Sequence, residues 1–183
     1  MTTIKNIFKH LHLINKHRWI VFKLSVKAGI PFRGLLHDLS KYSLIEFCES
    51  VKYYSGNKSP ITNAKIDKGY SKAWLHHKGR NKHHSEYWYD FKAPDSKPII
   101  PYKYVAEMIC DKLSAGIVYN GKKWTKSTQL EYFEAHKDEE LINSKIENML
   151  EEVFKQVSEK GIDPVINAKN LKMLYKKYTW IKV

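Results

Sequence analysis

The residues best suited to chemistry in this chain are its histidines. The 183-residue sequence contains nine of them, at positions 10, 12, 17, 37, 76, 77, 83, 84 and 136. Several lie within a few residues of an aspartate or a glutamate. Imidazole and carboxylate groups together bind Zn, Mn, Fe, Co or Ni. The sequence therefore directs attention to three segments where such groups gather, at 37–41, 76–84 and 107–111.

His37 and Asp38 form an adjacent imidazole–carboxylate pair that follows the apolar residues Leu35 and Leu36. Neighbouring side chains on a helix diverge by about 100°. The pair therefore converges on one ion only where the helix ends or bends. Alone, the dipeptide is a weak signal, because a core histidine beside a surface aspartate has the same sequence. Lys41 follows Asp38 by three residues, so it is expected near the same face, either at the site or in contact with solvent.

Four histidines lie within nine residues at positions 76–84. The first and third are seven residues apart, as are the second and fourth, so two helical turns would place each pair on one face. Asn81 would share the face of His77 and His84. Gly79 weakens the prediction of an unbroken helix. A surface cluster is the alternative interpretation of this segment.

Glu107 and Asp111 lie four residues apart in a mostly apolar segment. This spacing places both carboxylates on one side of a helix. A carboxylate on a largely apolar helix is costly unless it is paired or bound to metal. We therefore interpret Asp111 as a candidate ligand with Glu107 beside it. A helix with two exposed acids is the alternative.

The elements that must position these residues are predicted to be helical, because apolar residues recur at three- and four-residue intervals and no stretch shows sustained strand alternation. Gly29 and Pro31 separate the first two helices, Ser43 and Asn63 are candidate N-caps, and Asp163 begins the last helix. The prediction is an all-α fold, with helices at about 3–28, 31–38, 43–54, 63–79, 101–119, 127–137, 138–160 and 163–178, and a partly helical segment at 80–92.

Composition bounds the remaining possibilities. The chain has 32 Lys and Arg against 19 Asp and Glu, a formal charge of +13, and two cysteines. Two cysteines cannot build a disulfide framework. There is neither a signal-peptide pattern nor an apolar run of the roughly 18 residues that a membrane helix needs. The positive charge either solubilises the surface or attracts nucleic acid, an anionic membrane surface or an anionic small substrate. With no candidate membrane span, we expect a cytoplasmic protein with no membrane partner.

Taken in order, the motifs resemble the HD-domain superfamily of metal-dependent phosphohydrolases, whose pattern is a histidine, a His-Asp pair and a distant aspartate on a helical fold. The Leu-Leu-His-Asp-Leu-Ser-Lys string ending at Lys41 carries this resemblance most closely. The resemblance implies that four residues bind one divalent metal ion: His17, His37, Asp38 and Asp111. It implies a second ion that is bridged by Asp38 and held by a pair among His76, His77, His83 and His84. We choose His77 and His84, because Asn81 would share their face and could orient a ligand or water, with His83 as the nearest substitute.

The motifs His-Asp-x-Ser-Lys, His-x-x-x-Asn-x-His-His-x-Glu-Tyr-Trp and Glu-Met-x-Cys-Asp also resemble a small family of uncharacterised bacterial and phage proteins of HD type. That resemblance carries no activity and spans about residues 10–125. We therefore expect an HD-like metal-binding helical bundle at 1–125. Additional C-terminal helices at 126–183 are expected to pack on it as part of one globular unit.

The resemblance to the superfamily implies a phosphomonoesterase or phosphodiesterase that uses one or two divalent ions and acts on a small phosphorylated substrate, a nucleotide among the candidates. The predicted catalytic residues are Asp38, Lys41 and Glu107. The predicted substrate-binding residues are Lys41, Arg18, Arg80, Asn81 and Trp88. Two other functions stay open: an HD-fold di-iron oxygenase with the same ligands, and a basic nucleic-acid-binding protein with a structural or degenerate metal site.

Overall fold

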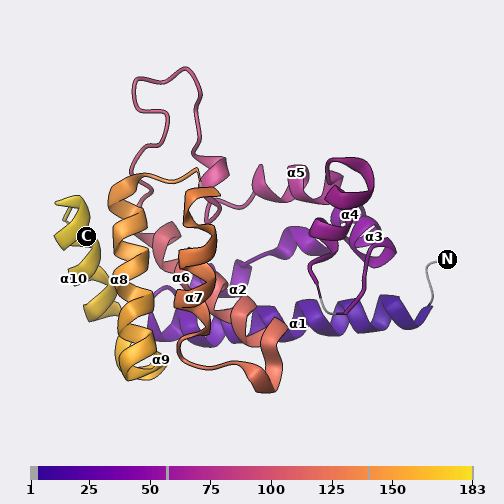
Figure 1. The fold of residues 1–183 in the computed structure, drawn as a ribbon, viewed down its shortest axis with the longest axis horizontal. Helices are drawn as coiled ribbons and strands as arrows, with labels where there is room; N and C mark the ends of the chain where they lie inside the picture. The colour runs from indigo at the N-terminus through magenta and orange to yellow at the C-terminus, as the bar shows by residue number, and fades with distance from the viewer. Residues whose placement is uncertain (1–3, 57, 140, 183) are drawn as a thin grey trace.

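The structure, a computed structural model, describes residues 4–56, 58–139 and 141–182. Within these residues it contains α-helices and short 3-10 turns and no β-strand, which confirms the predicted all-α class (Figure 1). The longer helices are α1 (Ile4–Lys27), α6 (Tyr102–Asn120), α8 (Ser144–Lys160) and α10 (Ala168–Thr179). The shorter helices are α2 (Pro31–Leu36), α3 (Leu44–Lys52), α4 (Pro60–Lys68), α5 (Lys72–Lys78), α7 (Thr128–His136) and α9 (Ile162–Val165).

Helix α6 packs along α1 at the centre of the fold. Figure 1 shows α3, α4 and α5 gathered towards the N-terminal part of α1, and α7 to α10 gathered towards its C-terminal part. The apolar core lies where α6 meets α1, α8 and α10, and its fully buried side chains include Val21, Ile109, Leu113, Phe154 and Leu171. Side chains from the C-terminal helices thus share one core with α1 and α6. Among the described residues, none of the helices combines the length and apolar character that a membrane span needs.

The predicted break between the first two helices and the predicted N-cap of the third are confirmed, whereas the helices predicted over 31–38 and 43–54 end earlier, at Leu36 and Lys52. Helix α1 ends at Lys27, Gly29 takes a left-handed φ of 75°, and Pro31 is the first residue of α2. Ser43 is the N-cap of α3, because its Oγ accepts a hydrogen bond from the backbone N–H of Glu46 at 3.4 Å. These turns fix the start of α2 and of α3, which flank the His37–Asp38 pair.

The segment predicted as one helix at 63–79 forms two helices instead. Helix α4 begins at Pro60 and ends at Lys68, and the next residue, Gly69, has a left-handed φ of 78°. Ser71 then begins α5, because its Oγ accepts from the backbone N–H of Trp74 at 3.1 Å. Gly69 ends α4, and the Ser71 N-cap begins α5. These two local signals override the apolar periodicity that predicted a single helix across this segment.

Two C-terminal helix boundaries are also corrected by the structure. Helix α8 begins at Ser144 rather than at 138, because the Asn143 side chain accepts from the backbone N–H of Lys145 at 3.1 Å. The helix predicted at 163–178 is divided into α9 and α10. Asn167 begins α10 by accepting from the backbone N–H of Asn170 at 2.9 Å. Asparagine N-caps therefore set both boundaries.

Gly34 lets α2 pack directly against α1. A Cβ at position 34 would lie 2.4 Å from the Cβ and 2.7 Å from the Oγ of Ser25, which is fully buried. Gly34→Ala is therefore expected to lower the free energy of unfolding by about 1–3 kcal/mol, because α2 must move away from α1. Chemical denaturation measures this change. Gly79→Ala is the control, since a Cβ there meets carbonyl oxygens at 3.3 Å and beyond, and equal losses in the two variants would contradict the packing argument.

Candidate metal centre

The turn after α2 brings His37 and Asp38 into one buried site. Helix α2 ends at Leu36, His37 leaves the helix with φ −53° and ψ 130°, and Asp38 adopts the left-handed conformation with φ 54° and ψ 27°. Such a conformation costs on the order of 1–3 kcal/mol for a residue other than glycine and persists where the surrounding structure imposes it. Both residues are 1% exposed. The pair thus lies where the helix ends, which is the position that the sequence analysis required for convergence on one ion.

One group of possible ligands joins α1, the turn after α2, and α6: His17, His37, Asp38 and Asp111. The Nε2 atoms of His17 and His37 lie 3.4 Å apart, and they lie 3.0 Å and 3.5 Å from Oδ1 of Asp111. Each residue offers an atom within 4.8 Å of those of the others. Ligands bound at about 2.0–2.2 Å to one ion are separated by about 3–4 Å. The donor set therefore fits a divalent ion, with the four residues that the sequence predicts.

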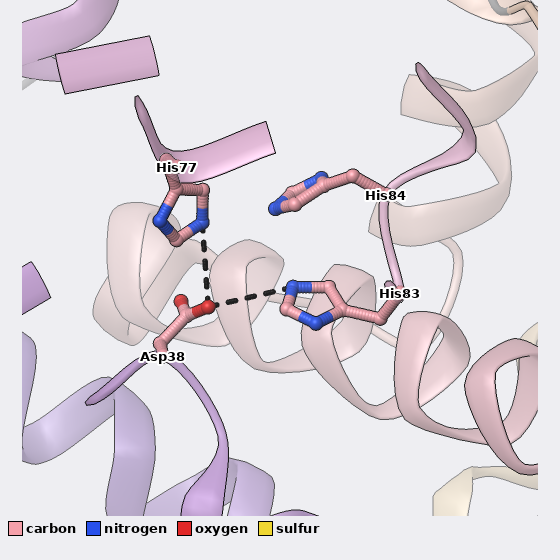
Figure 2. Close-up of side chains that lie close together, drawn as sticks. All are labelled: Asp38, His77, His83 and His84. Atoms are coloured by element: carbon pink, nitrogen blue, oxygen red, sulfur yellow. Dashed lines mark ion pairs between the residues drawn. The ribbon is translucent and has the colours of Figure 1, made fainter. Parts of the chain in front are cut away.

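A second group contains Asp38, His77, His83 and His84 (Figure 2). Oδ1 of Asp38 lies 3.3 Å from Nε2 of His77 and 3.4 Å from Nε2 of His83. The ring of His84 lies 4.8 Å from that of His77 and 4.3 Å from that of His83, between centroids. Its buried Nε2 has no hydrogen-bond partner among the described residues. Asp38 thus faces both groups, where the superfamily resemblance implies a bridging ligand.

These histidines do not meet on one helix, contrary to the sequence prediction. Helix α5 ends at Lys78, and His83 and His84 follow in turns beyond it. Asn81 closes these turns, because its Nδ2 donates to the backbone carbonyl of His77 at 2.9 Å and to Oγ of Ser40 at 2.8 Å. The chain folds back and delivers both later histidines to Asp38. His83 therefore belongs to the group together with His84, rather than as its substitute.

Glu46 is a residue of this site that the sequence analysis missed. It is 3% exposed on α3 and accepts from Nδ1 of His77 at 2.8 Å and from Nδ1 of His76 at 2.6 Å. A proton on Nδ1 of His77 leaves its Nε2 lone pair directed at Asp38, as metal-binding histidines require. An acid three residues after a serine N-cap is typical of helix capping. That local pattern explains why the role of Glu46 could not be recognised from its position in the sequence.

Glu107 accepts a hydrogen bond from another candidate ligand, His37, as Glu46 does from His77. Its Oε1 accepts from Nδ1 of His37 at 3.0 Å and lies 3.3 Å from Nδ1 of His83. Its Oε2 accepts from Nε and NH2 of Arg33 at 2.8 Å and 2.5 Å. Arg33, which the sequence analysis also missed, compensates the buried charge. Glu107 thus orients ligands and does not line the pocket described below.

The electrostatics of the site favour ionised carboxylates and differ among the histidines. At His37, burial would lower the pKa, but the carboxylate of Asp38 outweighs it and raises that pKa well above its usual value. Burial alone would raise the pKa of Asp38, but the charges of His37 and Lys41 outweigh it and hold that pKa well below its usual range. Burial is likewise outweighed at Glu107, where hydrogen bonds from His37 and His83 lower the pKa to about 2. At His84, burial and the neighbouring histidines lower the pKa well below its ordinary value. Its imidazole is therefore neutral and can donate a lone pair to a metal.

An inner pocket of about 200 Å³ opens onto both groups. His17, Lys41, Asp111, His77 and His84 line one part of it, and its remaining walls are mostly apolar, from residues that include Leu13, Ile14, Ile61, Trp74 and Val118. Nζ of Lys41 lies 2.6 Å from Oδ2 of Asp38. Burial disfavours the ammonium, but the carboxylates of Asp38 and Asp111 outweigh it and raise the pKa of Lys41. Lys41 therefore brings a fixed positive charge to the pocket.

Residues 6–156 match a protein family described as "Family of unknown function (DUF5662)". The chain belongs to this family. The matched range includes every residue of the two ligand groups, from His17 to Asp111. No curated protein and no solved structure matches the chain. Membership of DUF5662 therefore assigns no activity to the chain, and the function proposed below rests on the geometry of the site.

Four of the five substrate-binding residues predicted in this DUF5662 chain do not line the inner pocket, and one of them, Asn81, closes the turns after α5. Arg18 donates from Nε to the carbonyl oxygen of His37 at 2.7 Å and from NH2 to that of Leu35 at 2.8 Å, so it braces the turn after α2. Trp88 packs against the apolar core, and its indole N–H donates to the Lys82 carbonyl at 2.7 Å. Arg80 is exposed and does not line the inner pocket. Sequence neighbours of a ligand point in many directions, so proximity in sequence does not by itself place a side chain in the pocket.

His10 lines the inner pocket on the same helix as His17 and is 6% exposed. Burial, together with the charge of Lys41, lowers the pKa of His10 from 6.5 to about 4. The unfolded chain therefore binds more protons between these values, so stability is full above pH 6.5 and falls as the pH drops towards 4. His10→Phe is expected to reduce this loss by about 2 kcal/mol.

Urea denaturation of the metal-free protein at pH 7 and pH 4.5 measures this effect. His12→Phe is the matched control, because His12 is exposed on the same helix. The pH dependence of the control should equal that of the wild type. A His10→Phe protein with the same pH dependence as the control would contradict the assignment.

Proposed function

We propose that this protein is a metal-dependent phosphohydrolase of the HD type that acts on a small phosphorylated substrate. The observation that carries the proposal is the position of Asp38, which is 1% exposed and belongs to both ligand groups. A buried carboxylate among several imidazoles is the environment expected of a metal ligand. The order of the ligands along the chain agrees with the resemblance to the HD superfamily. One or two divalent ions are therefore part of the proposal.

The two ligand groups lie on two sides of Asp38, and each would hold one metal ion. His17, His37 and Asp111 would hold one ion with Asp38, and the later histidines would hold the other. Divalent ions bound there would lower the pKa of bound water towards neutrality and neutralise phosphate oxygens. Glu46 and Glu107 accept the Nδ1 protons of ligand histidines, which keeps the Nε2 lone pairs directed inward.

The substrate class follows from the inner pocket. Lys41 presents its ammonium beside Asp38 and is positioned to donate hydrogen bonds to a phosphate oxygen. The apolar walls exclude water from the other side of the pocket, which strengthens these charge interactions. At about 200 Å³, the pocket is smaller than the roughly 300–1,000 Å³ typical of sites for drug-sized ligands. The group held inside it is therefore small.

Elemental analysis of the purified protein, followed by a phosphoester screen with Mn, Co, Ni and Fe, tests this function. We expect bound transition metal and metal-dependent release of phosphate or of an alcohol under nitrogen as well as in air. Strict dependence on oxygen in the iron-loaded protein would favour an oxygenase instead. The His37→Ala/Asp38→Ala double variant should lose turnover, whereas His12→Ala/Asp95→Ala, at exposed positions, should keep it. Turnover that persists in the first variant would contradict the site.

A further inference from the structure

A second and larger cavity reaches Asp111, one of the candidate metal ligands, from outside the inner pocket. This outer groove has a volume of about 850 Å³ and lies between α6, α7 and the start of α4. It shares four lining residues with the inner pocket: Ser59, Asp111, Ala115 and Tyr119. The two spaces therefore meet at Asp111, a member of the first ligand group. Helix α7, from the C-terminal segment that resembles nothing of known role, supplies one wall.

The two spaces differ in chemistry as well as in size. The inner pocket is small and mostly apolar, whereas the outer groove is lined by polar side chains that include Lys58, Asn120, Gln129 and Glu131. A phosphate placed beside Asp111 and Lys41 would have one space on each side. A phosphomonoester has one organic arm and would leave one space without a ligand. A phosphodiester has two arms and would use both.

The groove also contains a preformed pair of rings on α7. Tyr132 and His136 stack with their centroids 4.3 Å apart and their planes at 21°. Nδ1 of His136 bonds to the carbonyl oxygen of Tyr132 at 2.8 Å, which fixes the pair. Tyr132 is 57% exposed in the groove. An exposed ring held in this way offers a stacking surface to a planar group.

We propose that the outer groove binds the larger arm of a phosphodiester, an arm that carries a polar planar ring, and that Tyr132 determines which substrates are accepted. This inference rests on the proposed phosphohydrolase function. In the reaction, a water oxygen forms a bond to phosphorus and one ester P–O bond breaks. The leaving oxygen takes a proton from water, and the products are a phosphomonoester and an alcohol. The smaller arm lies in the inner pocket and the larger arm lies against α7.

Three chromogenic esters that release 4-nitrophenolate test the proposal: 4-nitrophenyl phosphate, bis(4-nitrophenyl) phosphate and the 4-nitrophenyl ester of thymidine 5′-phosphate. We expect the thymidine ester to have the highest kcat/KM. Tyr132→Ala should lower its kcat/KM relative to that of the monoester by about tenfold, as expected for loss of base stacking. Tyr132→Phe should keep the wild-type ratio of kcat/KM for the thymidine ester to kcat/KM for the monoester. Tyr70 is an exposed tyrosine outside both cavities, so Tyr70→Ala should also leave this ratio unchanged.

A binding measurement separates this inference from the proposed function. Calorimetry on the manganese-loaded protein should show that Tyr132→Ala raises the Kd of thymidine 5′-phosphate about tenfold and leaves that of inorganic phosphate unchanged. Tyr132-dependent binding without hydrolysis of any ester would support the groove and contradict the phosphohydrolase function. Hydrolysis of the monoester at least as fast as of both diesters, with the Kd of thymidine 5′-phosphate insensitive to Tyr132→Ala, would overturn the inference and leave the function standing.

Discussion

Asp38→Asn is expected to lower phosphoester turnover by about a thousandfold or more and to remove most of the bound metal. The carboxylate of Asp38 faces both ligand groups, so its loss affects each of them. Metal ions contribute several kcal/mol of transition-state stabilisation, and each 1.36 kcal/mol is about tenfold in rate. Steady-state kinetics and elemental analysis of the same preparations measure the two effects.

The asparagine substitution removes the charge of residue 38 while keeping the backbone conformation that this position requires. Asp38 has a left-handed φ of 54°, and asparagine is one of the residues that adopt this conformation most readily. The turn after α2 should therefore survive, with the helical circular dichroism unchanged. Asp95→Asn is the matched control, because Asp95 is exposed in the loop before α6. Wild-type metal content and turnover in Asp38→Asn would show that Asp38 is not a ligand.

Glu107→Gln and Glu46→Gln are expected to weaken metal binding by about 10–100-fold, in different ways. Glu107 contacts His37 of the first group and His83 of the second, whereas Glu46 contacts His77 of the second. The Glu107 oxygens face histidine nitrogens on one side and Arg33 on the other. In Glu107→Gln, the side-chain amide would place its NH2 group against one of these N–H donors, whichever way the amide is turned. Glu107→Gln should therefore weaken the binding of both metal ions, and Glu46→Gln should weaken the binding of one of them.

Titration of the metal-free proteins with Mn, followed by calorimetry, resolves these losses as separate binding steps. We expect Glu46→Gln to keep one step of wild-type affinity and Glu107→Gln to keep none. Glu49→Gln serves as the control, because Glu49 lies one turn along α3 from Glu46 and bonds to Ser71 outside both ligand groups. Loss of thermal stability with unchanged metal affinities would mean that the two acids are structural only.

The sequence predicts which candidate ligands lie close together where the signal is local. The four-residue spacing of Glu107 and Asp111 places both acids on α6, as the structure has them. The helix predicted over 31–38 ends at Leu36 instead, and this early end is what brings His37 and Asp38 together. His17 lies in the first group because α1 is a continuous helix that packs along α6. Short-range helical patterns were sufficient for these positions.

The sequence does not predict contacts that depend on how distant segments pack. Glu46 and His77 are 31 residues apart, and Arg33 and Glu107 are 74 apart, so no local pattern joins either pair. The arrangement of His83 depends on the turns after α5, where helical spacing no longer applies. The formal charge of +13 could not indicate which cation faces the pocket. The structure places Lys41 there and assigns Arg18 to a backbone brace.

An anomalous difference map from crystals of the manganese-loaded protein tests the central claim most directly. The account predicts a peak among His17, His37, Asp38 and Asp111, and a second peak among Asp38, His77, His83 and His84, with the carboxylate of Asp38 between them. A single peak in the first group would reduce the site to one metal. A map of fully loaded crystals with no peak beside Asp38 would contradict the account.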